Sequence, residues 1–228
     1  PDGVHCAFVH DKIRSSLLER LTEDERRSLH HRIALSLQAD APDRVFDLAY
    51  HFDAAGESDH ATTYALTGAR QARAQHSLEV AEQQYRIAEN GAHSADVDTQ
   101  YAIAGGLGEV LMLRGRYDLA AELFEKAELF ADGEYARAQI KGKLGELAFK
   151  RGDIESATVA FEAALRQLGR TVPRRTVGFA LMLLWEVALQ TIHTLLPSVS
   201  VGRRKRKPAE AELLAARLFS RLAHGYWF

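Results

Sequence analysis

The feature that most constrains this chain is an internal repeat between residues 101 and 165. Gly115 and Gly152 are 37 positions apart, and Phe124 and Phe161 are separated by the same interval. A constant offset of about 20–50 residues is typical of stacked structural repeats. The positions that define the two copies are Gly108, Gly115, Ala120, Phe124, Gly145, Gly152, Ala157 and Phe161. An ordinary helical bundle does not require two copies in register, so the pattern favours a repeat array.

Each copy predicts two antiparallel helices joined by a tight turn. In the first copy, Gly108 lies on the inner face of the first helix, where its missing side chain lets a second helix approach closely. Gly115 stands where the first helix has to end, because glycine accepts the left-handed dihedrals of a helix terminus. Ala120 keeps the second helix small at the crossing, and Phe124 fills the space one turn further on.

These copies resemble the tetratricopeptide repeat, whose pattern W-x2-L-G-x2-Y…A-x3-F…P recurs about every 34 residues. The matching segments are Leu107-Gly108 with Ala120-x3-Phe124, and Leu144-Gly145 with Ala157-x3-Phe161. The chain departs from the pattern at the Trp position (Ala104, Lys141) and the Tyr position (Leu111, Ala148), and it lacks the closing Pro. The resemblance implies an all-α, right-handed solenoid of antiparallel helix pairs with a concave groove for a peptide or protein.

The first 40 residues differ from the repeats. Residues 4–9 are β-branched and aromatic and predict a short strand, and Thr22 with Glu25 predicts a helix-starting capping box. The segments FVHDKIR (8–14), LLERL (17–21), ERR (25–27) and LHHRIA (29–34) resemble the junction between winged helix and helical repeats in bacterial STAND-class signalling ATPases. That resemblance extends to about residue 90. It implies a winged-helix remnant here, a nucleotide-binding domain upstream, and linkage to a nucleotide cyclase, kinase or DNA-binding output domain.

Three further divisions follow. Residues 41–92 predict degenerate repeats, because Gly56 and Ala61 keep the spacing of Gly115 and Ala120, and Ala81 with Tyr85 keeps that of Ala120 with Phe124. Residues 93–169 hold the two clear repeats. Residues 170–228 hold a long apolar helix, a basic loop and the first helix of a truncated further repeat.

The apolar stretch 177–196 is long enough to raise the possibility of a membrane span. Glu186, Gln190 and His193 interrupt it at helical spacing and form one polar stripe, so an interior helix of the array is the favoured interpretation. The basic run 203–207 has the composition of a patch for acidic lipid or phosphate, which gives membrane or nucleic-acid tethering as the alternative function. A solvated loop is the simpler interpretation, so neither partner is favoured.

The last segment, 213–228, has the spacing of a first repeat helix without its second helix. Its apolar stripe predicts packing partly on the 177–196 helix. Residues 226–228 would then lie at an intermolecular contact, which makes a homodimer through the C-terminal helix an expectation.

Composition and motifs weigh against an enzyme. The net charge of −2 points to neither nucleic acid nor membrane overall, and the single cysteine, Cys6, fits a reducing cytoplasm. The chain starts with Pro1 and not Met, which suggests an excised fragment. No phosphate-binding loop and no clustered metal-ligand motif occur in the sequence, so no cofactor, metal or catalytic residue is expected. Glu186 with His193 is the one acid–base pair that an enzyme could use.

The sequence therefore predicts a non-catalytic interaction or sensor module of a signal-transduction ATPase. Ligand occupancy would shift an attached ATPase between resting and active states. Candidate groove residues are the outward positions of the first helix of each clear repeat: Glu109, Met112, Lys143 and Glu146.

Overall fold

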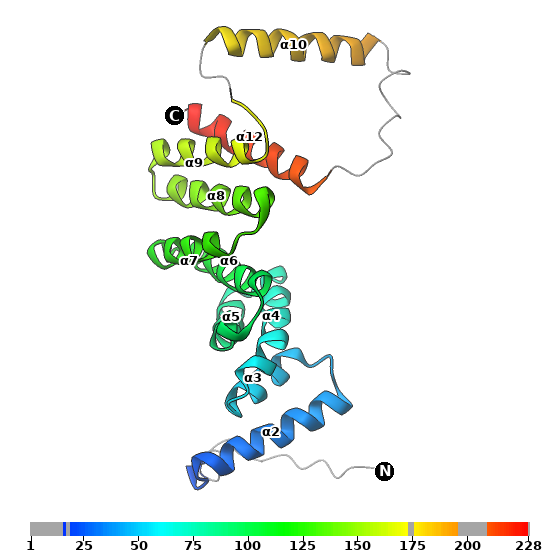
Figure 1. The fold of residues 1–228 in the computed structure, drawn as a ribbon, viewed down its shortest axis with the longest axis vertical. Coiled ribbons are helices and arrows are strands. Elements are labelled where there is room, and N and C mark those ends of the chain that lie inside the picture. The colour runs from blue at the N-terminus through cyan, green and yellow to red at the C-terminus, as the bar shows by residue number, and fades with distance from the viewer. Residues whose placement is uncertain (1–15, 17–18, 173–175, 196–208, 228) are drawn as a thin grey trace. The chain divides into compact units, whose positions relative to one another are not determined.

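The computed structural model describes residue 16 and residues 19–172, 176–195 and 209–227, in which every regular element is a helix (Figure 1). The helices are α2 (Glu23–Asp40), α3 (Val45–Ala54), α4 (Ser58–Ala74), α5 (Leu78–Asn90), the short 3₁₀ helix η1 (Ala92–Ser94), α6 (Val97–Leu113), α7 (Tyr117–Phe130), α8 (Gly133–Lys150), α9 (Ile154–Gln167), α10 (Thr176–Leu195) and α12 (Glu210–Trp227). This confirms the all-α fold class. The strand expected at residues 4–9, with its winged-helix remnant, and the basic run 203–207 lie outside the described residues.

The chain divides into two compact units, residues 1–127 and 128–228. In the first unit, consecutive helices from α2 to α6 pack against one another in chain order. The predicted capping box begins α2: the Thr22 hydroxyl accepts a hydrogen bond from the Glu25 amide at 3.3 Å, and the Glu25 carboxylate accepts one from the Thr22 amide at 2.8 Å.

One contact is repeated in both clear helix pairs, α6 with α7 and α8 with α9. A Cβ atom added to Gly108 would lie 2.8 Å from the Phe124 ring, and one added to Gly145 would lie 2.8 Å from the Phe161 ring. Both rings are buried. Each phenylalanine therefore occupies space that any side chain larger than glycine would fill, as the repeat pattern predicts.

Four helix hairpins share the same turn. The turn residue has a positive φ in each of them: Gly56 (83°), His76 (58°), Gly115 (76°) and Gly152 (82°). A fully buried alanine follows five positions later in every case, namely Ala61, Ala81, Ala120 and Ala157. The degenerate region thus repeats the geometry of the clear repeats. His76 holds the left-handed conformation without the freedom of glycine, and this turn lies where the Ala81–Tyr85 spacing of the degenerate repeats predicts it.

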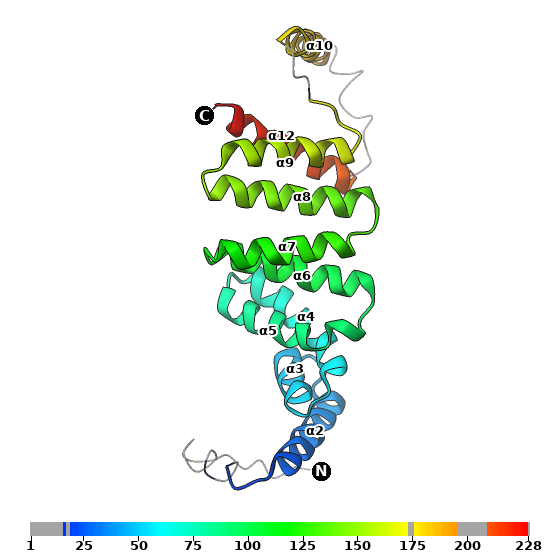
Figure 2. The ribbon, with the colours of Figure 1, turned by 60° about the vertical axis from the view of Figure 1, so that its left-hand side comes forward.

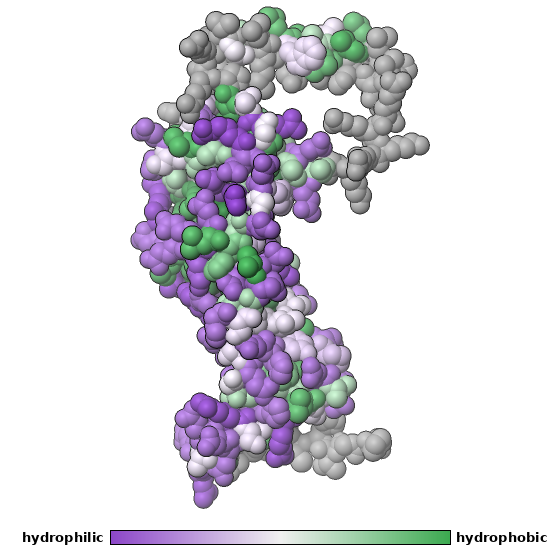
Figure 3. All heavy atoms as spheres, in the orientation of Figure 1, coloured by the Kyte–Doolittle hydropathy of each residue, from purple (hydrophilic) through white to green (hydrophobic). Residues whose placement is uncertain are grey.

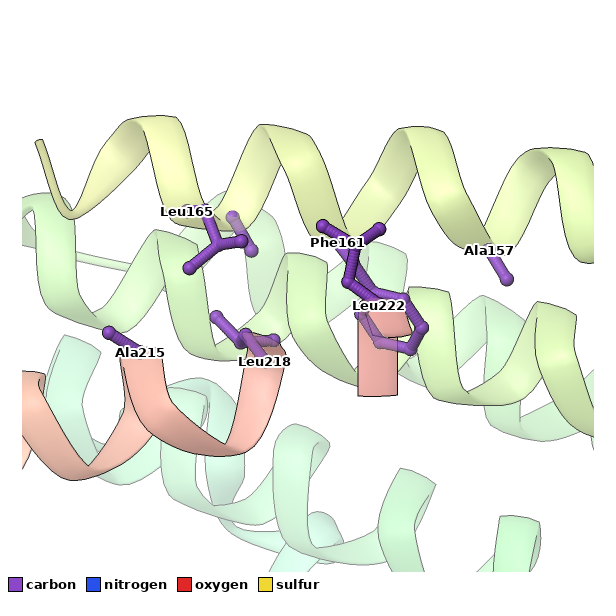
Figure 4. Packing of buried hydrophobic residues seen from close by; sticks show 7 residues of the cluster. Ala157, Phe161, Leu165, Ala215, Leu218 and Leu222 are labelled. Carbon is purple, nitrogen blue, oxygen red and sulfur yellow. The ribbon is translucent and has the colours of Figure 1, made fainter. Parts of the chain in front are cut away.

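In the second unit, α8 and α9 run side by side (Figure 2), and α12 packs on this pair. Leu218 and Leu222 of α12 point toward Phe161 and Leu165 of α9 (Figure 4) and are 2% exposed. The expectation that this last helix packs on the 177–196 helix is therefore wrong, because its apolar stripe is buried against α8 and α9.

Helix α10 confirms the predicted helical stretch but not its predicted burial. Most of its described large apolar side chains are exposed, with Leu184 and Trp185 at 65% and Leu195 at 72%, and Figure 3 shows strongly hydrophobic atoms on the surface of this helix. The prediction of an interior helix is wrong for these side chains, since α12 already covers α9. Among the described residues, no helix has the length and apolar character needed to cross a membrane.

We predict that Gly145→Ala destabilises the protein by about 1–3 kcal/mol, because the new methyl group would overlap the buried Phe161 ring and approach the Ala157 carbonyl oxygen, 3.2 Å away. Gly142→Ala, in the same helix, is the matched control. There the methyl group meets only the Leu218 side chain, whose Cδ2 atom at 2.8 Å is the end of an aliphatic chain and shifts more readily than an aromatic ring and a backbone carbonyl. A gain of about 1 kcal/mol in helix propensity offsets that contact. Urea unfolding of both variants measures the difference, and equal stabilities would refute the close-packing argument.

Candidate ligand-binding site

The candidate site lies in the second unit, around Glu146 of α8. The Lys143 amine lies 3.8 Å from the Glu146 carboxylate, and Arg221 of α12 forms an ion pair with it. The Glu146 side chain is only 18% exposed, so its two cationic neighbours hold a partly buried charge. Because Arg221 comes from a helix far along the chain, the site exists only once α12 has packed on α8 and α9.

Beside this ion-pair network is a cavity of about 320 Å³. Its lining residues come from α8, α9 and α12: Glu146, Phe149, Lys150, Phe161, Arg221 and His224. The two phenylalanines provide apolar surface, while Lys150 and Arg221 place cationic groups around it. A small apolar group that carries a negative charge complements this combination.

The end of α12 is fixed by two polar contacts. The Tyr226 hydroxyl donates a 2.7 Å hydrogen bond to the buried Glu162 carboxylate of α9. His224 lies 2.7 Å from the Ser220 carbonyl through Nδ1. Since a carbonyl only accepts, Nδ1 must carry a proton, which leaves the Nε2 of neutral His224 as an acceptor. Tyr226 remains half exposed and makes this contact within its own chain.

The four expected groove residues separate between the two units. Lys143 and Glu146 lie together in the site just described. Glu109 lies in the first unit, where it forms an ion pair with Arg73 of α4. Met112 is 2% exposed, so the expectation that it faces outward is wrong: it packs into the core of the first unit.

The sequence reasoning missed the residues that complete the site. Phe149 and Lys150 follow Glu146 on the same helix and could have been found by continuing the α8 face one turn. Arg221 and His224 were not found, because the last helix was predicted to pack elsewhere. Their positions next to Leu218 and Leu222 in the helical pattern indicated only that they border the buried stripe of α12.

A second polar cluster joins α2 to α3 and α4 in the first unit. The Nδ1 atoms of His30 and His51 lie 2.8 Å apart, and Tyr50 packs edge-on against both rings. Glu57 forms hydrogen bonds with His31 and with His60, the latter at 2.8 Å. The buried residues of α2 are only His30 and Ala34, so this helix docks mainly through polar contacts.

Burial lowers the pKa of His30, and the positive charge of Arg26 lowers it further. Burial also lowers the pKa of His51, as do the charges of His30 and Arg44, against an opposing effect of Asp47. In a hydrogen-bonded imidazole pair one nitrogen must accept, so the contact requires at least one neutral ring. Burial would raise the pKa of Glu57, but the hydrogen bonds from His60 and His31 outweigh it and the pKa is lowered.

Within the part of the chain that the structure describes, no group of three or more His, Cys, Asp or Glu side chains could hold a metal ion. The side chains of Glu186 and His193 are outside the described residues, so the acid–base pair stays a prediction. Neither family models nor curated proteins match this chain.

We predict that acidification weakens the docking of α2. A histidine whose folded pKa is lowered contributes stability above its unfolded pKa of about 6.5, and this contribution is lost as the pH falls below that value. The lowered pKa of Glu57 adds a loss in the same direction below about pH 4.5. Thermal unfolding and hydrogen exchange of α2 at pH 7.5 and at pH 5 measure the effect.

His51→Gln tests the origin of this pH dependence, because glutamine retains hydrogen-bonding capacity but does not titrate. It should flatten the change in stability between pH 7.5 and pH 5. His93→Gln, an exposed position outside the cluster, should retain the full change. If both variants behave like the parent chain, the histidine pair is not the titrating element.

Proposed function

We propose that this chain is a non-catalytic interaction module, a right-handed solenoid of the tetratricopeptide type, that binds a peptide or protein. The observation that carries the proposal is the recurrence of the same glycine–phenylalanine packing in the α6–α7 and α8–α9 pairs. Stacked pairs of this kind present continuous surfaces, and such surfaces serve binding more readily than chemistry.

The cavity between α8, α9 and α12 offers a place for such a ligand. Its Phe149 and Phe161 surface would take an apolar side chain, and Lys150 at its rim would attract a neighbouring acidic group, whereas Arg221 is already paired with Glu146. We therefore propose that the bound segment carries an apolar residue next to an acidic one.

The parent protein, on this proposal, is a bacterial STAND-class signalling ATPase, with a nucleotide-binding domain upstream and a cyclase, kinase or DNA-binding output. The support is the sequence resemblance of residues 8–34. Binding of a ligand in the repeats would then shift the ATPase between two states to the extent that the ligand prefers one of them.

Selection of a displayed peptide library on the purified chain tests the binding function. We expect enriched sequences that pair an apolar with an acidic residue. Lys150→Glu should weaken their binding about tenfold, because repulsion of about 1.4 kcal/mol replaces attraction at the cavity rim. The matched control is Lys126→Glu, which makes the same charge reversal away from the cavity, at a partly exposed ion pair with Glu89. Calorimetric titration of synthetic peptides gives the affinities.

Two results would contradict the proposal. Enriched peptides that bind parent and Lys150→Glu equally would move the ligand away from this cavity. Hydrolysis of a nucleotide or ester by the purified chain, abolished by Glu186→Gln or His193→Gln, would replace the binding function with an enzymatic one.

A further inference from the structure

In the second unit, the segment between α9 and α12 is inserted between two helices that pack against each other. Leu218 of α12 lies against Gly142 of α8, and Leu222 lies against the α9 core, so α12 follows α9 directly in space (Figure 4). The chain nevertheless places α10 between them. None of the described side chains of this helix belongs to the buried core that α8, α9 and α12 form.

The described side chains of α10 form an apolar, exposed surface. Leu184, Ala188, Ile192 and Leu195 follow one another at i, i+4, i+8 and i+11, which places them along one side of the helix. The three large ones are 65%, 48% and 72% exposed. Trp185, also 65% exposed, lies beside them. Leaving this much apolar surface in water is unfavourable, so we expect a partner to cover it.

The charge of this inserted segment indicates what kind of partner would cover the apolar surface of α10. Residues 170–207 contain eight cationic side chains, Arg170, Arg174, Arg175, Arg203, Arg204, Lys205, Arg206 and Lys207, and a single acidic one, Glu186. The chain as a whole has a net charge of −2. In the sequence, positive charge is thus concentrated before and after an exposed apolar helix. This combination binds an apolar phase that has an anionic surface.

We propose that α10 binds the surface of an anionic lipid bilayer, with its Leu184–Leu195 side in the acyl boundary, and that the positive charge of the flanking sequence strengthens this binding. A helix lying in the interface fits the chain connections better than one that crosses. Both ends of α10 lead back to helices that pack together, so a crossing helix would draw residues 196–209 and their five cations back through hydrocarbon.

Co-sedimentation with vesicles tests this proposal. Full-length chain should bind phosphatidylcholine vesicles that contain about 30% phosphatidylserine, and high salt should weaken this binding. Arg203→Gln with Arg204→Gln should lower the partition coefficient about 30-fold (about 2 kcal/mol, at about 1 kcal/mol per cation). In a Trp227→Phe background, the fluorescence of Trp185 should shift to the blue on binding.

Two double variants of equal charge separate the apolar contribution from the electrostatic one. Leu184→Glu with Ile192→Glu should lower the partition coefficient by more than about tenfold. Leu129→Glu with Val159→Glu places the same two charges at exposed apolar positions of α7 and α9 and should reduce binding far less. Circular dichroism of both variants checks that they remain folded.

Several outcomes would overturn the proposal. One is a parent chain that does not sediment with anionic vesicles, and another is equal binding by the two double variants. Binding to duplex DNA in place of vesicles would identify the insertion as a nucleic-acid contact. Self-association of the parent that is abolished by Leu184→Glu with Ile192→Glu, without vesicle binding, would identify a second copy of the chain as the partner.

Discussion

The close contact between a phenylalanine ring and a glycine backbone sets the distance between the helices of each clear repeat. Phe124 and Phe161 are completely buried against Gly108 and Gly145, where a methyl group would already overlap the ring. Because protein interiors are close-packed, this contact fixes the alignment of the two helices along their whole length. The buried alanine one turn earlier in each second helix depends on that alignment.

The second unit extends this packing to a helix from a distant part of the sequence. Leu218 and Leu222 of α12 continue the α9 core, and the same docking delivers Arg221 and His224 to the edge of the cavity. The apolar stripe of α12 thus stabilises the unit, and its adjoining polar positions supply the candidate site. A ligand at this site would contact three helices whose mutual packing the Phe161 contact maintains.

The first unit ends differently, in a helix held by polar contacts. The buried surface of α2 contains only His30 and Ala34, and histidine pairs replace the apolar stripe of the repeats. Hydrogen bonds between neutral rings depend on pH, whereas apolar packing does not. The first unit therefore joins helices held by apolar packing to the helix α2, whose attachment we expect to respond to protonation.

The sequence by itself determined the elements that local geometry controls. The offset of 37 residues predicted two helix pairs, Gly115 and Gly152 predicted their turns, and Thr22 with Glu25 predicted the start of α2. Each of these features depends on residues close together in the chain, where spacing and backbone preference decide the outcome.

Only the tertiary structure decided which apolar stripe covers which. The sequence pattern assigned the stretch 177–196 to the interior and Met112 to the surface, whereas Leu184 is exposed and Met112 is buried. Hydropathy records how strongly a side chain avoids water but not which neighbour is available to cover it. Because α12 fills the place beside α9, the more apolar helix α10 is left outside that core. For the same reason, the sequence alone did not predict the candidate site, because its residues come from three helices whose packing was not known.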